Sequence, residues 1–293
     1  MPIHDLLPSL KLEIKAIDFM RTGNWWNWTN INSPFSRLYL ITAGGASVNH
    51  HGRDYQLTCG KLHLIPCYCF WNCCCPDWFE LYYLHFTSSL AGGLDLFTVQ
   101  EYNYHFDASE KELRLFQRLL ELNPGRAIAT FNPHDPPSKR FPRDYLKTNP
   151  KKSPGELIES DGILRQLLAP FLATAHEYSD PAKKALKRFK DVFAYIDKNL
   201  DRPISLKKLG QVAQLSPTYF SDLFYAVMGT RPIEYINRKR IEKAQYLLCT
   251  EDDSIAEISQ KVGFSYVPYF SHMFKKYVGS SPHAYRKGHL DYA

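Results

Sequence analysis

The amino-acid sequence predicts an α+β protein of two domains. Residues 1–180 are expected to form a β-barrel with accessory helices, and residues 181–293 an all-α domain. Short β-type segments follow one another in the first half, and a pattern of short helices occurs twice in the last third. The first part holds 17 basic and 19 acidic residues, the last part 19 and 11. This asymmetry indicates that the last part binds a polyanion and that the first has another task.

The composition is that of a globular protein that does not span a membrane. Hydrophobic residues make up 44% and charged residues 23% of the 293 residues. No uncharged apolar run approaches the roughly 18 residues that cross a bilayer. Charged residues occupy the amino-terminal stretch where a signal peptide needs an apolar core, namely Asp5, Lys11, Glu13 and Lys15. We therefore expect a cytoplasmic protein.

An internal repeat organises the basic part. The hexapeptide YFSDLF at 219–224 recurs as YFSHMF at 269–274, fifty positions later. Ser205 lies fourteen positions before the first copy, and its counterpart Ser254 lies fifteen positions before the second. The repeat therefore contains a single insertion in its turn. A glycine and a proline follow each copy at the same offset, as Gly229 and Pro232 and as Gly279 and Pro282.

The first copy has the signals of two helices joined by a tight turn. Ser205 is a good N-cap for the first helix, Gln214-Leu215 form the turn, and Ser216-Pro217 begin the second helix. That helix ends near Gly229. Its apolar side contains Phe220, Leu223 and Phe224, and the residues expected to face outward are Thr218, Tyr219, Ser221 and Asp222.

The second copy has the same design. Ser254 caps its first helix, and Gly263-Phe264-Ser265 form the turn. The next helix is expected to bury Phe270, Met273 and Phe274 and to expose Val267, Pro268, Tyr269, Ser271 and His272. This is the helix-turn-helix arrangement, whose second helix enters the major groove of DNA. The outward residues of both copies are therefore our candidates for base contacts.

A helix over Ile233–Leu248 is expected between the two copies. Its sixteen residues would span about 24 Å, which suits recognition helices roughly one DNA turn apart. Basic residues on this helix and at the end of the second unit are candidate phosphate contacts, namely Arg238, Arg240, Lys275 and Lys276. The alternative is a helical bundle with solvated charges, but the duplicated caps, glycines and prolines favour DNA binding.

Residues 186–288 resemble the DNA-binding domain of the AraC/XylS family of bacterial regulators. The matching stretches are ISLKKLGQVAQLSPTYFSDLFYAVMGTRPIEYINRKRIEKAQYLL and SIAEISQKVGFSYVPYFSHMFKKYVGSSPHAYRK. The resemblance implies seven helices and binding to direct-repeat sites near promoters, with RNA polymerase as a further partner. The family often has arginine where this chain has Asp222 and His272. Asp222 can accept a hydrogen bond from cytosine N4 or orient a neighbouring side chain.

The first half has β-type segments at Leu38–Thr42, Tyr55–Leu57, Leu62–Pro66 and Phe79–Phe86. Gly44-Gly45 is expected to break the first of them. The pattern GKLHLIP followed by ELYYLHF resembles the cupin-like barrel that sensors of this family place before the DNA-binding domain. The resemblance implies an N-terminal cupin-like barrel that binds a small-molecule effector.

Polar and aromatic residues on the predicted strands are candidates for an effector site. Alternation places Arg37 on one strand face, and Tyr83 with His85 on a face of another. Trp71, from a connecting loop, is expected beside them, with Trp26 and Trp28 over the mouth. Indole faces suit sugar rings, and arginine suits hydroxyls or a carboxylate, so a sugar is one option. The alternative is that these aromatic residues are plain barrel core.

A metal site, a cofactor and an enzymatic activity are not expected. Metal-binding cupins need convergent histidines, whereas His50 and His51 are adjacent and face opposite ways on a strand. His63 and His85 lack evident partners. The five cysteines between Cys67 and Cys75 suit either a thiol site or small buried hydrophobes, and we assign them no site.

The middle of the chain is expected to be irregular from Thr130 to Pro154 because it is rich in proline. A capping box at Ser153–Glu156 begins a helix that reaches about Tyr178. Its apolar stripe is expected to pack either on the barrel or on a second subunit and contains Leu164, Leu167, Leu168 and Phe171. Ser179-Asp180-Pro181 is the expected linker.

Together these features predict a dimeric transcription regulator controlled by an effector. Two alternatives remain at the level of sequence. One is a DNA-binding regulator that needs no ligand and whose barrel only dimerises. The other is a cupin enzyme fused to a DNA-binding domain.

Overall fold

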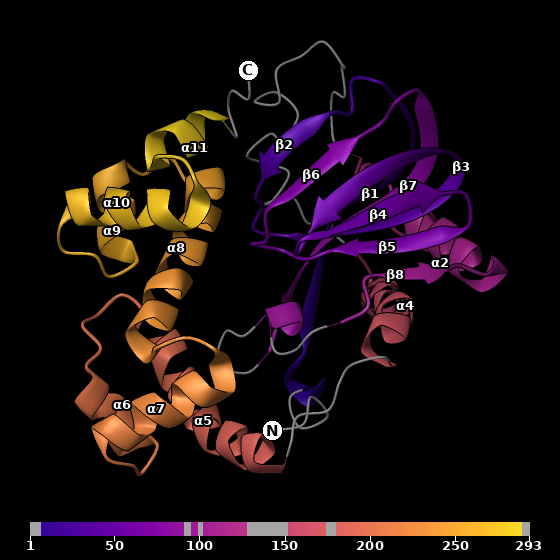
Figure 1. Ribbon diagram of the computed structural model, residues 1–293. Coiled ribbons are helices and arrows are strands. Elements are labelled where there is room, and N and C mark those ends of the chain that lie inside the picture. Colours follow the sequence, from indigo (N-terminus) through magenta and orange to yellow (C-terminus); the bar gives the residue numbers. More distant parts are fainter. Residues whose placement is uncertain (1–6, 91–94, 99–101, 128–151, 174–179, 289–293) are drawn as a thin grey trace. The chain divides into compact units, whose positions relative to one another are not determined.

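The computed structural model describes residues 7–90, 95–98, 102–127, 152–173 and 180–288. The chain forms two compact units. The β unit comprises residues 12–88, 100–175 and 287–293, and the helical unit comprises residues 1–11, 89–99 and 176–286. Strands with flanking helices make up the first unit, and helices dominate the second (Figure 1). No helix in the described ranges is long and apolar enough to cross a membrane.

Eight strands in the described part of the chain form one connected sheet. Their bounds are β1 (Lys11–Gly23), β2 (Trp28–Ile31), β3 (Ser36–His50), β4 (Arg53–Thr58), β5 (Lys61–Ile65), β6 (Trp71–Cys74), β7 (Trp78–Ser89) and β8 (His105–Asp107). The main order is β1-β7-β3-β5-β8, while β4 and β6 also pair with β3, and β2 pairs with β6. The long strand β3 is therefore the centre of the unit.

Strand β3 bends at Gly44 and joins two groups of strands. Residues before the bend pair with β5 and β7, and residues after it pair with β4 and β6. Gly44 has φ +68°, and a Cβ there would overlap the backbone O of Trp78. The expectation that Gly44-Gly45 break the strand was wrong. Glycine instead lets one strand turn from one group of partners to the other.

The other predicted β segments lie in strands, but β1 was not predicted. Tyr55–Leu57, Leu62–Ile65 and Phe79–Phe86 fall within β4, β5 and β7. In β1 the residues from Ile14 to Ile17 are all buried, including Lys15. This run breaks the alternation by which strands are recognised, and charged residues surround it.

Among its described residues the β unit has two helices, α2 (Glu110–Glu121) and α4 (Pro154–Ala173). The predicted capping box at the start of α4 is present, because Ser153 N donates to Glu156 Oε2 at 2.8 Å and Glu156 N donates to Ser153 Oγ. The apolar stripe of α4 is buried, and Phe171 lies 5.1 Å from Phe106 between ring centroids. The stripe therefore packs within the chain. The last predicted residues of this helix lie outside the described residues.

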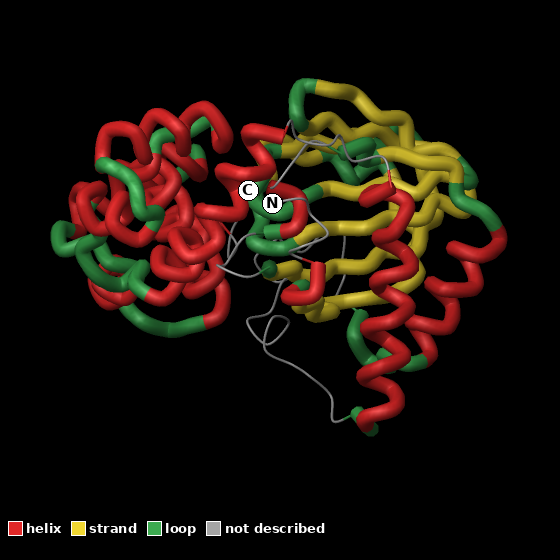
Figure 2. The backbone as a smooth tube through the Cα atoms, turned by 90° about the horizontal axis from the view of Figure 1, so that it is seen from below, coloured by secondary structure: helices red, strands yellow, loops and turns green. Residues whose placement is uncertain are grey.

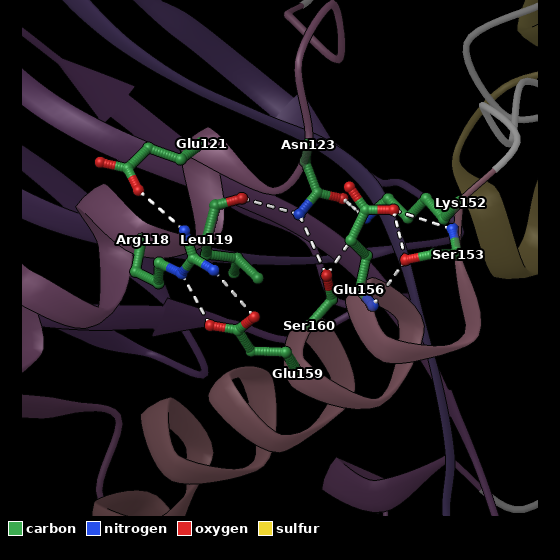
Figure 3. Close-up of polar contacts among 9 residues, drawn as sticks. All are labelled: Arg118, Leu119, Glu121, Asn123, Lys152, Ser153, Glu156, Glu159 and Ser160. Atoms are coloured by element: carbon green, nitrogen blue, oxygen red, sulfur yellow. Dashed lines mark hydrogen bonds and ion pairs between the residues drawn. The ribbon is translucent and has the colours of Figure 1, made fainter.

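Polar contacts join α2 to α4 (Figure 3). Arg118 donates from Nε and Nη2 to the two carboxylate oxygens of Glu159 at 2.6 and 2.9 Å. The buried Asn123 donates to Leu119 O at 2.7 Å and lies within 3.4 Å of Ser160 Oγ. This bidentate pair and the buried amide hold the two helices in one register.

Seven helices span residues 180–288, as the resemblance implies. They are α5 (Asp180–Lys198), α6 (Leu206–Val212), α7 (Pro217–Met228), α8 (Pro232–Thr250), α9 (Ile255–Lys261), α10 (Val267–Val278) and α11 (Pro282–Gly288). Figure 2 shows these helices and their short loops. Asp180 and Pro181, which were expected to belong to a linker, are instead the first residues of α5. Ser179 lies outside the described residues.

The predicted caps of these helices are present. Ser205, Ser216 and Ser254 each accept a hydrogen bond from a backbone N–H of the first helical turn. Gly229 and Gly279 end their helices in the left-handed conformation. Local sequence therefore determines where these helices begin and end.

Helix α8 takes part in two similar cores. Its residue Tyr235 lies 5.5 Å from Phe224 in the first, and Ile241 belongs to the second, which also contains Phe270 and Phe274. Lys239 of α8 is only 8% exposed, and its Nζ lies 2.7 Å from Glu242 Oε2. Burial alone would lower the pKa of Lys239, but the Glu242 carboxylate raises it above its usual value.

Candidate nucleic-acid interface

The two helix-turn-helix units repeat the same turn. In the first, Leu215 N donates to Gly210 O at 2.9 Å, and in the second Phe264 N donates to Ser259 O at 2.9 Å. The residue at the tip of the first turn is Gln214, with φ +55°. Its counterpart in the second turn is Gly263, with φ +88°. The single insertion of the repeat lies just after the second turn, before α10 begins.

The second turn depends on Gly263 and on Arg240 of α8. A Cβ on Gly263 would overlap Leu200 O and would lie 2.9 Å from Nη2 of Arg240. Arg240 donates to Leu200 O at 2.9 Å and to Arg202 O at 2.6 Å. Its Cζ is 5.5 Å from the centroid of the Phe264 ring. The guanidinium thus joins the loop before α6 to the turn of the second unit.

This arrangement corrects the expectation for Arg240, which was predicted to contact phosphates. Two of its N–H groups donate to backbone carbonyls of the chain itself, and burial lowers its pKa. Arg238 is partly exposed and its Nε lies 3.9 Å from Glu242. Lys275 and Lys276 are exposed in the last turn of α10. These three remain the candidate phosphate contacts.

The nine candidate base contacts lie on the outer sides of α7 and α10. Exposed side chains are Thr218, Tyr219, Asp222, Pro268, Tyr269 and His272. Ser221, Val267 and Ser271 are half-exposed. Their positions suit contact with a groove, and their contact with bases remains a prediction.

A residue that sequence analysis did not select contacts the outer face of α7. Arg231 Nη1 donates to Asp222 Oδ1 at 2.6 Å and to Ser221 Oγ at 3.2 Å. Its Cζ lies 4.9 Å from the centroid of the Tyr225 ring. Arg231 follows the end of α7, nine positions after Asp222, so no helical spacing connects the two.

A surface depression of about 560 Å³ lies beside the amino-terminal end of α10. Its lining residues are Arg240, Gly263, Phe264, Ser265, Tyr266, Pro268 and Tyr269. Tyr266, the residue inserted just after the second turn, is 65% exposed. The second unit therefore presents two exposed tyrosine rings at the start of its recognition helix.

The structure brings most of the effector-site candidates together in the β unit. Arg37, Trp71, Tyr83 and His85 are all buried. The Arg37 Cζ lies 4.8 Å from the Trp71 ring centroid, and the Tyr83 and His85 rings are 5.2 Å apart. Trp26 lies 6.2 Å from Trp71. We call these five residues the arginine–aromatic cluster.

One expectation about these residues was wrong, and another stays a prediction. Trp71 was expected on a connecting loop, but it begins strand β6, because β2 and β3 both supply partners for this short segment. Trp28 lies on β2 opposite Cys73 and is half-exposed, and its place over a pocket mouth remains a prediction.

The arginine–aromatic cluster is rich in hydrogen-bond donors. Arg37 donates from Nη2 to Ser33 Oγ at 2.8 Å, and within the described residues it forms no ion pair. The buried Nε1 of Trp71 has no hydrogen-bond partner among the described residues. Burial, and then the charge of Arg37, lowers the pKa of His85 well below its usual value. The cluster thus combines a buried cation with an unsatisfied N–H, an arrangement that suits an acceptor oxygen.

Four histidines of the β unit form a chain that the sequence did not reveal. His51 and His50 approach through their Nδ1 atoms at 2.9 Å, and His50 Nε2 lies 3.1 Å from His63 Nε2. His63 Nδ1 lies 3.2 Å from His105 Nδ1. His63 was expected to lack partners but has two. No group of three or more histidine, cysteine or acidic residues in the described ranges is arranged to hold a metal ion.

All seven cysteines are free thiols. Cys67, Cys73 and Cys75 are buried, and burial raises the pKa of Cys73 to about 12. Buried neutral thiols behave as small hydrophobic side chains, which was one of the two alternatives for the cysteines between Cys67 and Cys75.

Comparisons with known proteins agree with the repeated turn. A family model for a helix-turn-helix domain matches residues 209–288. The arabinose operon regulatory protein of Salmonella typhimurium is 34% identical over 127 residues, which are 43% of this chain and 44% of that protein. Residues 209–288 thus form a helix-turn-helix domain similar to that of AraC-type regulators. The regulatory protein PocR of the same organism is 29% identical over 203 residues.

The similarity to these relatives is partial in length. The match covers 68% of this chain and 60% of PocR, whereas the match to the MmsAB operon regulatory protein of Pseudomonas aeruginosa covers 32% of this chain and 31% of that protein. The chain thus spans between about a third and 60% of the lengths of the curated relatives it matches.

A solved structure is similar over almost the whole chain. It is ToxT from Vibrio cholerae with an unsaturated fatty acid bound, and it covers 95% of this chain and 95% of its own. The TM-score is 0.51 with 14% sequence identity. This likeness shows the fold, a sheet-rich N-terminal part followed by a helical domain.

Proposed function

We propose that this protein is a sequence-specific transcription regulator of the AraC type, acting in the cytoplasm and controlled by a small-molecule effector. The duplicated helix-turn-helix carries this proposal. Its two recognition helices present exposed polar and aromatic side chains on a part of the chain with eight more basic than acidic residues. Base contacts by these side chains and phosphate contacts by Arg238, Lys275 and Lys276 follow from it.

Selection of DNA fragments tests this function. The full-length protein is incubated with sheared genomic DNA at moderate salt, and the retained fragments are sequenced. Enrichment of promoter-proximal fragments with two motifs about one helical turn apart is the expected result. Retention without sequence enrichment would leave only electrostatic binding and would contradict the proposal.

We place the effector in the arginine–aromatic cluster of the cupin-like β unit. The buried guanidinium of Arg37 and the unsatisfied Nε1 of Trp71 favour an effector with a carboxylate or with hydroxyl groups. The fatty acid bound to ToxT supports a carboxylate. A thermal-shift panel of fatty acids and sugars tests this assignment. Stabilisation by a compound, lost in Arg37→Met but retained in the exposed Arg53→Met, is the expected result.

Two further partners belong to the proposal. A second copy of the chain is proposed to pack on the exposed Leu157 and Ile158 of α4, which are 52% and 75% exposed. Sedimentation of the wild type and of Ile158→Glu tests this contact, since a dimer that survives the substitution would contradict it. RNA polymerase is the other proposed partner, and no catalytic role is proposed for either unit.

A further inference from the structure

The two helix-turn-helix units differ at one corresponding position. In the second unit the residue before Pro282 is Ser281, whose Oγ accepts a hydrogen bond from the backbone N–H of Ala284 at 3.1 Å. In the first unit the residue before Pro232 is Arg231, and no side chain caps the helix there. Serine is a preferred N-cap and arginine is not. The first unit therefore lacks the serine cap that the second unit has, and the side chain at the corresponding position is the guanidinium of Arg231.

The guanidinium of Arg231 turns back onto the recognition helix. Its Nη1 donates to Asp222 and Ser221, and its plane lies near the ring of Tyr225. These three residues share the outer face of α7. Asp222 and Arg231 are 63% and 49% exposed, so the pair stands on the surface that would face DNA.

We infer that Arg231 reads a guanine in the half-site bound by α7 and that Asp222 orients it. The inference rests on the proposed DNA-binding function. In the part of the chain that the structure describes, Nε and Nη2 of Arg231 have no hydrogen-bond partner, whereas Nη1 is occupied. Nε and Nη2 form one edge of the planar group. That edge matches the O6 and N7 acceptors of guanine in the major groove.

The pairing with Asp222 favours a base over a phosphate. A phosphate contact depends on net positive charge, and the Asp222 carboxylate at 2.6 Å cancels the charge of Arg231. Base reading depends on the direction of the N–H groups, which the carboxylate and the Tyr225 ring restrain. Position 222 itself is an aspartate, but the side chain of Arg231 places a guanidinium beside it.

Selection of random DNA by the full-length wild type and by Arg231→Ser tests the inference. Serine is chosen because Ser281 caps the corresponding helix. We expect Arg231→Ser to lose a guanine preference at one position of one half-site by roughly 5- to 150-fold. The other half-site keeps its preference. Arg231→Lys keeps the charge but lacks the planar fork, and is expected to lose the same preference.

The variant Asp222→Ala tests whether Asp222 orients Arg231 or contacts a base itself. It should weaken the same guanine preference, and should add nothing in the Arg231→Ser background. Loss of a separate cytosine preference in Asp222→Ala would overturn the inference, because Asp222 would then read a base itself. A uniform loss in Arg231→Ser with a salt slope shallower by about 0.9 would overturn it in favour of a phosphate contact. A wild-type protein without any motif would refute the proposed function, whereas a wild-type motif unchanged in Arg231→Ser refutes only this inference.

Discussion

Gly263 and Arg240 meet at the junction of the helical unit. A Cβ on Gly263 would lie 2.9 Å from Nη2 of Arg240, and that guanidinium donates to the backbone O atoms of Leu200 and Arg202. A glycine from the second turn and an arginine from α8 thus enclose the loop that precedes the first unit. The two helix-turn-helix units are joined by this contact as well as by α8.

Gly263→Ala is expected to destabilise the helical unit by at least about 2 kcal/mol. The residue has φ +88°, and its Cβ would overlap the backbone O of Leu200, which cannot move freely. Gly229→Ala is the matched control, since its φ is +66° and its Cβ would meet open space. It should lose only the roughly 1 kcal/mol of the left-handed conformation. Urea unfolding followed by circular dichroism measures both, and equal losses would contradict the role of the close contact.

Arg240→Ala is expected to lower stability and to leave the salt dependence of DNA binding unchanged. The variant loses two hydrogen bonds from a charged donor, which is expected to lower the free energy of unfolding by about 1.5–3 kcal/mol. The matched variant is Lys276→Ala, whose side chain is exposed. It should keep the stability and reduce the salt slope by about 0.9. Fluorescence anisotropy across a salt series checks this contrast, and a shallower slope in Arg240→Ala would restore the phosphate assignment.

Gln214→Gly is expected to stabilise the first unit by about 0.5–1 kcal/mol. Gln214 has φ +55° at the tip of the first turn, where the second unit has a glycine. Gln211→Gly within α6 is the control and should destabilise by about 1 kcal/mol, because its backbone is helical. Thermal unfolding of the two variants distinguishes them. A loss of stability in Gln214→Gly would mean that the side chain makes a contribution beyond the turn.

Stability of the β unit is expected to fall as the pH drops from 6.5 to 5. Burial, and then His51, lowers the pKa of His50 to about 3, while an unfolded histidine titrates near 6.5. The unfolded state therefore binds the proton first, and the stability present above pH 6.5 is lost below it. His50 alone accounts for about 1.5–2 kcal/mol over this window.

Denaturation at both pH values, followed by tryptophan fluorescence, measures this effect, because all five tryptophans lie in the β unit. His50→Gln should show a smaller loss between pH 6.5 and 5 than the wild type. His272→Gln, an exposed histidine of the helical unit, should behave as the wild type. An equal loss in wild type and His50→Gln would show that the histidine chain does not control this transition.

Features set by neighbouring residues could be predicted from the sequence. The serine caps, the glycine ends of α7 and α10, the capping box at Ser153 and the duplicated turn all depend on contacts within a few positions. The outer faces of the recognition helices follow from the helical period. The two-part fold class follows from the same patterns.

Features that join distant residues could not be predicted. The bend of β3 at Gly44 depends on the backbone of Trp78, and the pairing of Trp71 depends on β2. The burial of Lys239 depends on how α8 packs. In each case a local pattern allowed more than one conformation, and a partner far along the chain selected one.

The sequence by itself determined the helix-turn-helix repeat, its caps and the outward positions of its recognition helices, because hydrogen bonds within one or two turns specify them. Only the tertiary structure decided that Arg240 donates to backbone carbonyls of the chain itself, that Arg231 lies beside Asp222, and that four histidines form a chain. The physical reason is that a side chain's partners are chosen by which segments the packed core brings together, and no periodicity along the chain records that choice.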